Sequence, residues 1–148
     1  MALTNLPFRI SAIETSQFAF LEASYKENSD INLSVGVPIS ASDEDHSIQV
    51  ILNVQFKCEE TPFLILEVKV QFEIEPESFQ ALFVAKKKKK ALVIPVSLAR
   101  HLATIAVGTA RGVLHERLSK TKLNDLILTT IDLTKILEED IVLDRQKE

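Results

Sequence analysis

The sequence predicts an α+β fold: a four-stranded antiparallel meander sheet with a long C-terminal helix packed on it, followed by a shorter final helix. Three observations predict this fold. Four runs in the first half of the chain alternate apolar and polar residues, as strands with one buried face do. The connections between these runs are short, which favours antiparallel neighbours. After Pro95 the apolar residues recur at helical spacing instead.

The first predicted strand begins at Phe8 and continues to about Tyr25. Its alternation slips at Ile13 and then resumes, which indicates a bulge or bend in a long edge strand. The second predicted strand covers 31–40 and contains Pro38. Because proline cannot donate a ladder hydrogen bond, we expect Pro38 at a sheet edge, a strand end or a bulge.

The third and fourth predicted strands cover 48–57 and 64–74, and a tight connection from Glu59 to Pro62 joins them. One face of this sheet presents many large apolar side chains, each stabilising by about 1.5–3 kcal/mol when fully buried. Such a face needs a cover, and the C-terminal third of the chain is the candidate.

The long helix is predicted from Val96 to about Lys120, with Pro95 favourable in its first turn. Its surface is apolar or small on nearly every side, which is typical of a helix covered on two sides. We expect its own sheet on one side and a second subunit on the other. Gly108 and Gly112, one turn apart, would allow close backbone approach. The residues expected in this oligomer interface are Val107, Gly108, Arg111, Gly112, Leu114 and Leu118.

The crossover connector, 77–94, contains a predicted short amphipathic helix from Phe79 to Val84 and then five lysines, Lys86 to Lys90. A final helix is expected from Leu133 to Ile141, with Asp132 as its N-cap. The sequence therefore predicts a single domain over residues 1–148. Its predicted parts are the sheet (8–76), the connector (77–94), the helices (95–141) and a short polar tail (142–148).

The composition of the 148 residues is that of a globular protein, with 46% hydrophobic and 26% charged residues. No apolar run approaches the ~20 residues of a membrane helix, and the segment from Met1 to Pro7 does not have the pattern of a secretion signal. The one cysteine, Cys58, excludes an intrachain disulfide and fits a reducing compartment. We therefore expect a cytoplasmic protein.

The titratable residues do not predict an enzyme, a metal site or a cofactor. Cys58 has no identifiable histidine partner, so a structural thiol is favoured over a nucleophile. His101 and His115 lie on one helix about 21 Å apart and cannot share an ion. His46 follows three acidic loop residues, which is only a weak indication of cation binding and fits a solvated loop better.

The five lysines Lys86 to Lys90 are the strongest local charge in a chain whose net charge is −4. They are not interleaved with aromatic residues, so a solvated stretch is favoured over nucleic-acid binding. A third interpretation is that they flank a groove and attract acidic segments of a bound polypeptide.

An apolar surplus lies on the connector and the final helix, where neither the sheet nor the long helix requires it. One interpretation is that these side chains merely pack on each other. The sharper one is a long apolar groove that holds extended polypeptide. The pattern alone favours the first. The groove residues are Phe79, Leu82, Phe83, Leu92, Val93, Ile94, Leu133, Ile136, Leu137 and Ile141.

The order of elements resembles the SecB-like family over nearly the whole chain. The resemblance rests on diffuse segments: Phe8-Arg9-Ile10, Phe72-Glu73-Ile74, the crossover to Pro95, Ala99-Arg100, Arg111-Gly112, Leu126-Ile127-Leu128 and Ile131-Asp132-Leu133. It implies a homotetramer, a dimer of dimers, and an ATP-independent chaperone that holds unfolded precursors in apolar grooves beside the connector and last helix. The apolar surplus maps onto those grooves.

The resemblance also implies possible docking of the export ATPase SecA. Two acidic positions used for docking on the first strand read Gln17 and Leu21 here, although Glu67 on the fourth strand fits. Some relatives instead protect an antitoxin. The resemblance thus implies a cytoplasmic holdase acting in protein export or on another specific client. The alternatives are a small-ligand-binding domain or a purely structural oligomeric domain of the same fold.

Overall fold

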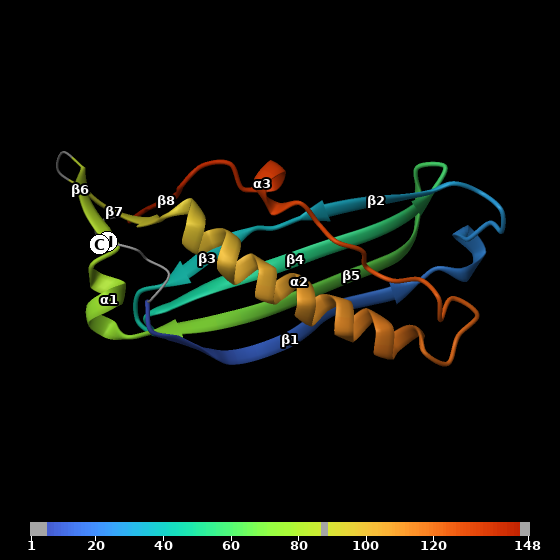
Figure 1. The fold of residues 1–148 in the computed structure, drawn as a ribbon, viewed down its shortest axis with the longest axis horizontal. Helices are drawn as coiled ribbons and strands as arrows, with labels where there is room; N and C mark the ends of the chain where they lie inside the picture. The colour runs from blue at the N-terminus through green and yellow to red at the C-terminus, as the bar shows by residue number, and fades with distance from the viewer. Residues whose placement is uncertain (1–5, 87–88, 146–148) are drawn as a thin grey trace.

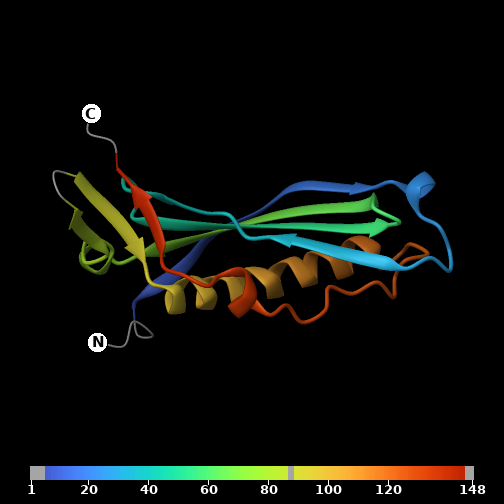
Figure 2. The ribbon, with the colours of Figure 1, turned by 90° about the horizontal axis from the view of Figure 1, so that it is seen from above.

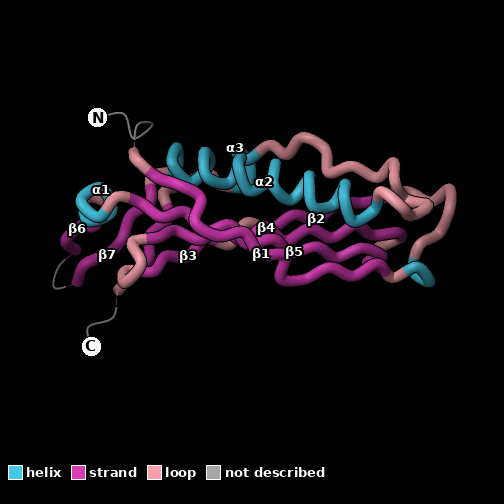
Figure 3. Tube along the Cα trace, turned by 90° about the horizontal axis from the view of Figure 1, so that it is seen from below, coloured by secondary structure: helices cyan, strands magenta, loops and turns pink. Residues whose placement is uncertain are grey.

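The computed structural model describes residues 6–86 and 89–145 as two antiparallel sheets, a long helix and short connecting elements. Figure 1 shows the long helix α2 lying along one face of the larger sheet, with the smaller sheet at one end. The views from above and below agree that the helix and the segment 119–140 that follows it lie on the same side of the larger sheet (Figures 2 and 3). The α+β class with a long covering helix is therefore confirmed.

Among the described residues, the larger sheet has five strands and the order β1-β5-β4-β2, with β3 also pairing with β4. The predicted meander is therefore wrong in strand order and number. A meander would place β1 beside β2, but β1 lies at the opposite edge and pairs with β5, as in a Greek key. The strands are β1 (Phe8–Phe20), β2 (Ile31–Gly36), β3 (Ile39–Ser42), β4 (Ser47–Cys58) and β5 (Thr61–Ile74).

The predicted second strand is two strands, because the ladder breaks around Pro38. Pro38 has no N–H to donate, while its carbonyl accepts a hydrogen bond from the Ile51 N–H at 2.9 Å. Its expected place at a strand end is confirmed. A bulge or bend was expected at Ile13, and the structure has two register shifts instead, one on either side of that residue, near Ser11 and Ser16. That strand ends at Phe20, and a 3₁₀ helix η2 (Glu22–Ser24) follows.

The core lies between the larger sheet and α2 (Val96–Leu118). Along β4 and β5 every second side chain is buried, which is the period of a strand with one covered face. These side chains meet the buried residues of α2, whose small alanines let the helix lie close to the sheet. The core residues of the helix are Leu98, Ala99, Leu102, Ala103, Ala106, Val107, Ala110, Leu114 and Leu118.

The connector and the C-terminal segment together form the smaller sheet, which the sequence did not predict. Its strand order is β6-β7-β8. The expected helix from Phe79 to Val84 is wrong: a five-residue helix ends before the chain extends into a hairpin. The elements of this region are α1 (Pro76–Gln80), β6 (Phe83–Lys86), β7 (Lys89–Ile94), α3 (Leu133–Ile136) and β8 (Ile141–Asp144).

The predicted final helix, Leu133 to Ile141, is wrong in length. The Asp132 cap is present, since its side chain accepts a hydrogen bond from the Thr134 N–H at 3.1 Å, but the helix ends after one turn. Ile141 belongs to a strand, and so do the first residues of the segment expected to be a polar tail. Residues 146–148 of that segment lie outside the described residues.

Candidate functional site

The predicted groove residues of the connector lie in α1, β6 and β7, at one end of the molecule (Figure 1). Phe79 of α1 is fully buried. Its ring contacts Phe83 edge to face at a centroid separation of 5.7 Å and His46 at 5.6 Å. These contacts place the connector against the turn before β4, so that the connector closes the end of the core.

The middle strand of the smaller sheet, β7, carries two more fully buried residues of this set. Leu92 and Ile94 are inaccessible to solvent. Leu92 lies opposite Phe83 on one side and Leu143 on the other, and Ile94 lies opposite Ile141. Paired residues of an antiparallel ladder share a face, so these residues form one apolar layer that faces the core.

The chain between α2 and β8, residues 119–140, is called the strap here. It runs beside α2 on the same side of the larger sheet (Figures 1 and 2). Leucines at intervals along it are buried in the common core, which explains part of the apolar surface of α2 without a second subunit. These leucines are Leu123, Leu128, Leu133 and Leu137.

Two arginines of α2 hold the strap through its backbone. Arg111 donates from Nε to the Leu128 carbonyl at 2.6 Å and from Nη2 to the Thr129 carbonyl at 3.1 Å. Arg100, three turns earlier, donates from Nε to the Leu137 carbonyl at 2.9 Å. Hydrogen bonds from a charged donor are stronger than neutral ones. The arginines therefore fix the path of the strap along the helix.

The end of the strap is fixed separately, at the start of α2. The Val96 N–H donates to the Asp140 carboxylate at 2.8 Å. This N–H is one of the four amides that the first turn of a helix leaves without a partner in the helix, and a carboxylate there also interacts favourably with the helix dipole. Asp140 thus anchors the chain immediately before β8.

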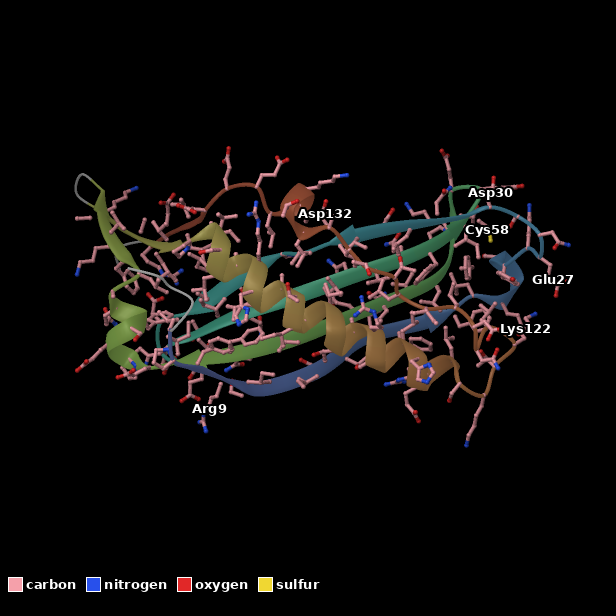
Figure 4. The ribbon with its side chains drawn as sticks, viewed as in Figure 1. Arg9, Glu27, Asp30, Cys58, Lys122 and Asp132 are labelled. Carbon is pink, nitrogen blue, oxygen red and sulfur yellow. The ribbon has the colours of Figure 1, made fainter. Side chains whose placement is uncertain are left out.

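At its other end the strap is joined to the connection between β1 and β2. Lys122 forms an ion pair with Glu22 at 3.0 Å, and this hydrogen bond is the main cause of a raised Lys122 pKa. Hydrogen bonds from Thr134 lower the pKa of Asp132. Figure 4 shows Lys122 near Glu27 at this end and Asp132 farther along the strap, beside α2.

The structure brings the predicted groove residues into one apolar region but fills the space between them. Ile136 and parts of Phe83, Val93 and Ile141 are accessible to solvent. Beside them, Val84 and Val142 on the smaller sheet are 49% and 45% exposed. The remaining groove residues are buried: Phe79, Leu82, Leu92, Ile94, Leu133 and Leu137.

The predicted interface residues of α2 lie on different sides of the helix. Val107, Leu114 and Leu118 are buried within the chain, and Arg111 binds the strap. Gly108 and Gly112 face outward, and a Cβ at either would meet no atom within 4 Å. An outward face of small residues remains on α2, bordered by half-buried Ile105, Thr109 and Val113.

The charged candidates lie apart from the apolar region or at its margin. Glu67 is on the outer side of β5, where Ser16 Oγ donates to its carboxylate at 2.5 Å. Lys86 and Lys89 are opposite each other at the end of the β6–β7 hairpin, and Lys90 is exposed. Lys87 and Lys88 lie outside the described residues.

The described side chains do not form a metal cluster of three or more His, Cys, Asp or Glu residues. Cys58 is buried at the end of β4, where its Sγ lies 4.0 Å from the Lys26 carbonyl oxygen. Among the described residues, no helix is long enough and apolar enough to cross a bilayer. The notable feature of the region is apolar surface and strand edges rather than reactive groups.

The sequence did not reveal the arginine and Asp140 tethers or the pairing of β8 with β7. The tethers join residues far apart in the chain, and they bind backbone carbonyls in the case of the arginines and a backbone N–H in the case of Asp140, which have no sequence signature. For β8 there was a weak signal, since Ile141 to Leu143 are consecutive aliphatic residues with high strand propensity.

Comparison with known proteins identifies the fold. No family model matches the sequence, and no curated protein matches it. A SecB-like chaperone of Mycobacterium tuberculosis, solved in complex with a ChAD peptide from the HigA1 antitoxin, is similar in structure, with a TM-score of 0.52 at 12% sequence identity. The match covers 84% of this chain and 90% of that one. The chain therefore has a SecB-like fold, as the sequence resemblance predicted.

Proposed function

We propose that this protein is an ATP-independent holdase chaperone that binds unfolded or precursor polypeptides. The observation that carries the proposal is the SecB-like fold, shared with a chaperone solved in complex with a peptide. The client is either a protein for export or a specific partner such as an antitoxin. The work takes place in the cytoplasm and needs no bond-making chemistry.

The apolar region of the smaller sheet and strap supports binding of polypeptide. Val84 and Val142 are exposed on the face of the smaller sheet opposite its buried aliphatic layer, and Ile136 is exposed on the strap. An unfolded chain offers both apolar side chains and unpaired backbone groups, and a sheet edge beside apolar surface can bind both. Many weak contacts of this kind suit a protein that must release its client unchanged.

The outward face of α2 supports the proposal of a homotetramer, a dimer of dimers. Gly108 and Gly112 leave that face flat, and the neighbouring edge strand β1 exposes Ile10 and Ile13 to 45% and 54%. Exposed apolar surface on this scale commonly marks a protein interface. We therefore place the subunit contact there, and not at Val107, Leu114 and Leu118, which are core residues.

Docking of the export ATPase SecA is a further part of the proposal, with Glu67 as the candidate contact. Glu67 lies on the sheet face away from α2, between Gln17 of β1 and Asn53 of β4. Its carboxylate already accepts a hydrogen bond from Ser16, and its two cross-strand partners are uncharged. A Glu67→Gln variant would lose SecA binding if this contact is used.

The experiment that tests the proposal measures aggregation of a reduced, unfolded test protein by light scattering, without nucleotide. The wild type is expected to suppress aggregation, and Val84→Glu and Ile136→Glu are expected to suppress it severalfold less. Both side chains are more than a third exposed, so neither variant should unfold. Ile127→Glu is the matched control, since Ile127 is 55% exposed but lies in the strap outside the predicted groove.

Unchanged aggregation in the presence of the wild type would refute the holdase proposal. The close packing of Phe79, Leu82, Leu92 and Ile94 would then favour the alternative of a purely structural oligomer, because these side chains fill the space that a groove would need. Equal loss in Ile127→Glu would show that a general surface effect, and not this region, is responsible.

A further inference from the structure

Strand β8 occupies one edge of β7 in the way that an added peptide strand would. Four residue pairs align antiparallel, from Ala91 opposite Asp144 to Ile94 opposite Ile141. The Arg145 N–H extends the ladder by donating to the Lys90 carbonyl at 3.3 Å. Backbone pairing of this kind, with alternate side chains entering apolar positions, is how sheet edges recognise extended peptides.

The two partners of this ladder differ in how firmly they are buried. The β7 residues Leu92 and Ile94 are fully buried, whereas Leu143 and Ile141, which face them, are half-buried, and Val142 is exposed. Since burial of apolar surface supplies most of the stabilisation, β8 contributes much less to the fold than the strand on which it lies. The edge of β7 would remain a formed, apolar template without it.

The anchors of the strap allow β8 to leave without disturbing the rest of the chain. Asp140 is bound to the Val96 N–H and the Leu137 carbonyl to Arg100, so both contacts precede the strand. After the strand, Arg145 forms an ion pair with Asp43 at 2.6 Å, and this side-chain contact holds the far end of β8. To free β8 from β7, it would be enough to break this ion pair and the four residue pairs of the ladder.

We propose that β8 is an internal occupant of the client site, and that a client binds by replacing it along the edge of β7. This inference rests on the proposed holdase function and specifies its site. The client segment is an extended, aliphatic stretch that runs antiparallel to β7. The protein closes this edge with its own strand when no client is bound, which also prevents the edge from pairing with other sheets.

The sequence of β8 indicates which client segments fit. Two aliphatic side chains at alternate positions enter the layer beside Leu92 and Ile94, as Leu143 and Ile141 do. A carboxylate at the position of Asp144 lies on the same face as Lys89, diagonally across the ladder. Clients with two aliphatic residues at alternate positions followed by an acidic residue should therefore bind best.

A reversible cross-link between β7 and β8 tests the proposal in the full-length chain. Val93 and Val142 are directly opposite each other. Because the Arg145 N–H bonds to Lys90, and bonded pairs alternate along an antiparallel ladder, Val93 and Val142 form a non-hydrogen-bonded pair, whose side chains are closer. Val93→Cys with Val142→Cys can thus form a disulfide, while Cys58 is buried at the far end of β4.

The matched control places the same cross-link between β6 and β7. Ala85 and Lys90 are opposite each other and exposed, and they too form a non-hydrogen-bonded pair, since the Val93 N–H bonds to the Leu82 carbonyl. Ala85→Cys with Lys90→Cys therefore staples the hairpin and leaves β8 free to move. Each variant is compared with its own reduced form.

The measured quantity is the affinity for a reduced, carboxymethylated lactalbumin. Oxidation of Val93→Cys/Val142→Cys is expected to lower it by more than about tenfold, because the competent state is removed, and oxidation of the control is expected to leave it unchanged. Equal affinity of the oxidised and reduced β7–β8 variant would overturn the inference while leaving the holdase function intact. If the wild type itself does not bind, both proposals fail.

Discussion

The larger and the smaller sheet use the same antiparallel pairing but differ in what lies on them. In the larger sheet, β4 and β5 bury every second side chain under α2. In the smaller sheet, the apolar half of β7 is mostly buried while its neighbours β6 and β8 keep exposed valines. The first is a frame whose stability comes from apolar burial. The second is a surface whose outer strands are held by short ladders and a few polar contacts, and binding sites are drawn from such less stable regions.

The largest expected difference between the two regions concerns loss of one leucine from each. Leu102 is fully buried between α2 and the larger sheet, so Leu102→Ala should lower the free energy of unfolding by about 2–5 kcal/mol. Leu143 of β8 is half-buried, so Leu143→Ala should cost only about 1 kcal/mol. Urea denaturation of both variants measures this. Equal losses would show that β8 belongs to the frame.

The tether between α2 and the strap is expected to have the next largest effect. Arg111→Met keeps an apolar stem but removes the hydrogen bonds to the Leu128 and Thr129 carbonyls, which should cost about 1–3 kcal/mol. Limited proteolysis should detect faster cleavage of the strap, with α2 and the larger sheet still intact. Lys120→Met, at an exposed position just after α2, is the control. Unchanged cleavage would mean that the buried leucines alone hold the strap.

A substitution on the outward face of α2 should either stabilise the protein or weaken its oligomer, depending on whether that face is an interface. In an isolated chain, Gly112→Ala should stabilise the helix by about 1 kcal/mol, because the added Cβ meets no other atom. If two copies pack closely on that face, as proposed, the same change should weaken the oligomer. Native mass spectrometry and thermal unfolding distinguish the two outcomes. A more stable protein with an unchanged oligomeric mass would remove this face from the interface.

The smallest expected effect concerns pH and the single turn of α3. The pKa of Asp132 lies below its usual 3.8 because Thr134 donates to the carboxylate. A carboxylate whose pKa is lowered by folding stabilises the fold above its usual pKa, and this contribution is lost as the pH falls through the lowered value. Relative to its intrinsic rate, hydrogen exchange at the Thr134 amide should therefore accelerate as the pH falls below 3.8, the usual pKa of the carboxyl group. In Asp132→Ala that acceleration should be absent.

The frame was predictable from sequence because its physics is local. Alternation over 48–57 and 64–74 identified β4 and β5, and the helical period after Pro95 identified α2. Strand order was not predictable, because alternation fixes which face of a strand is buried but not which strand lies beside it. Nothing in the β1 pattern distinguishes pairing with β5 from pairing with β2.

The sequence predicted which apolar residues make up the candidate site, but not the secondary structure that they adopt. The apolar residues of the connector do come together, yet as strands, since a hairpin of four and six residues interrupted by lysines has too few alternations to recognise. The spacing of Leu133, Ile136, Leu137 and Ile141 imitates one helical face. In the structure the helix ends at Ile136 and Ile141 begins β8, because the strap must extend to reach β7.

Hydrogen exchange of the full-length protein, with and without a bound unfolded client, tests most directly whether a client replaces β8. We predict that the amides of β8 (Ile141–Asp144) and of Arg145 exchange faster when client is bound, while those of β7 and α2 keep their protection. Exchange at β8 that is unchanged or slower in the complex would contradict this prediction, because the client would then bind without taking the place of that strand.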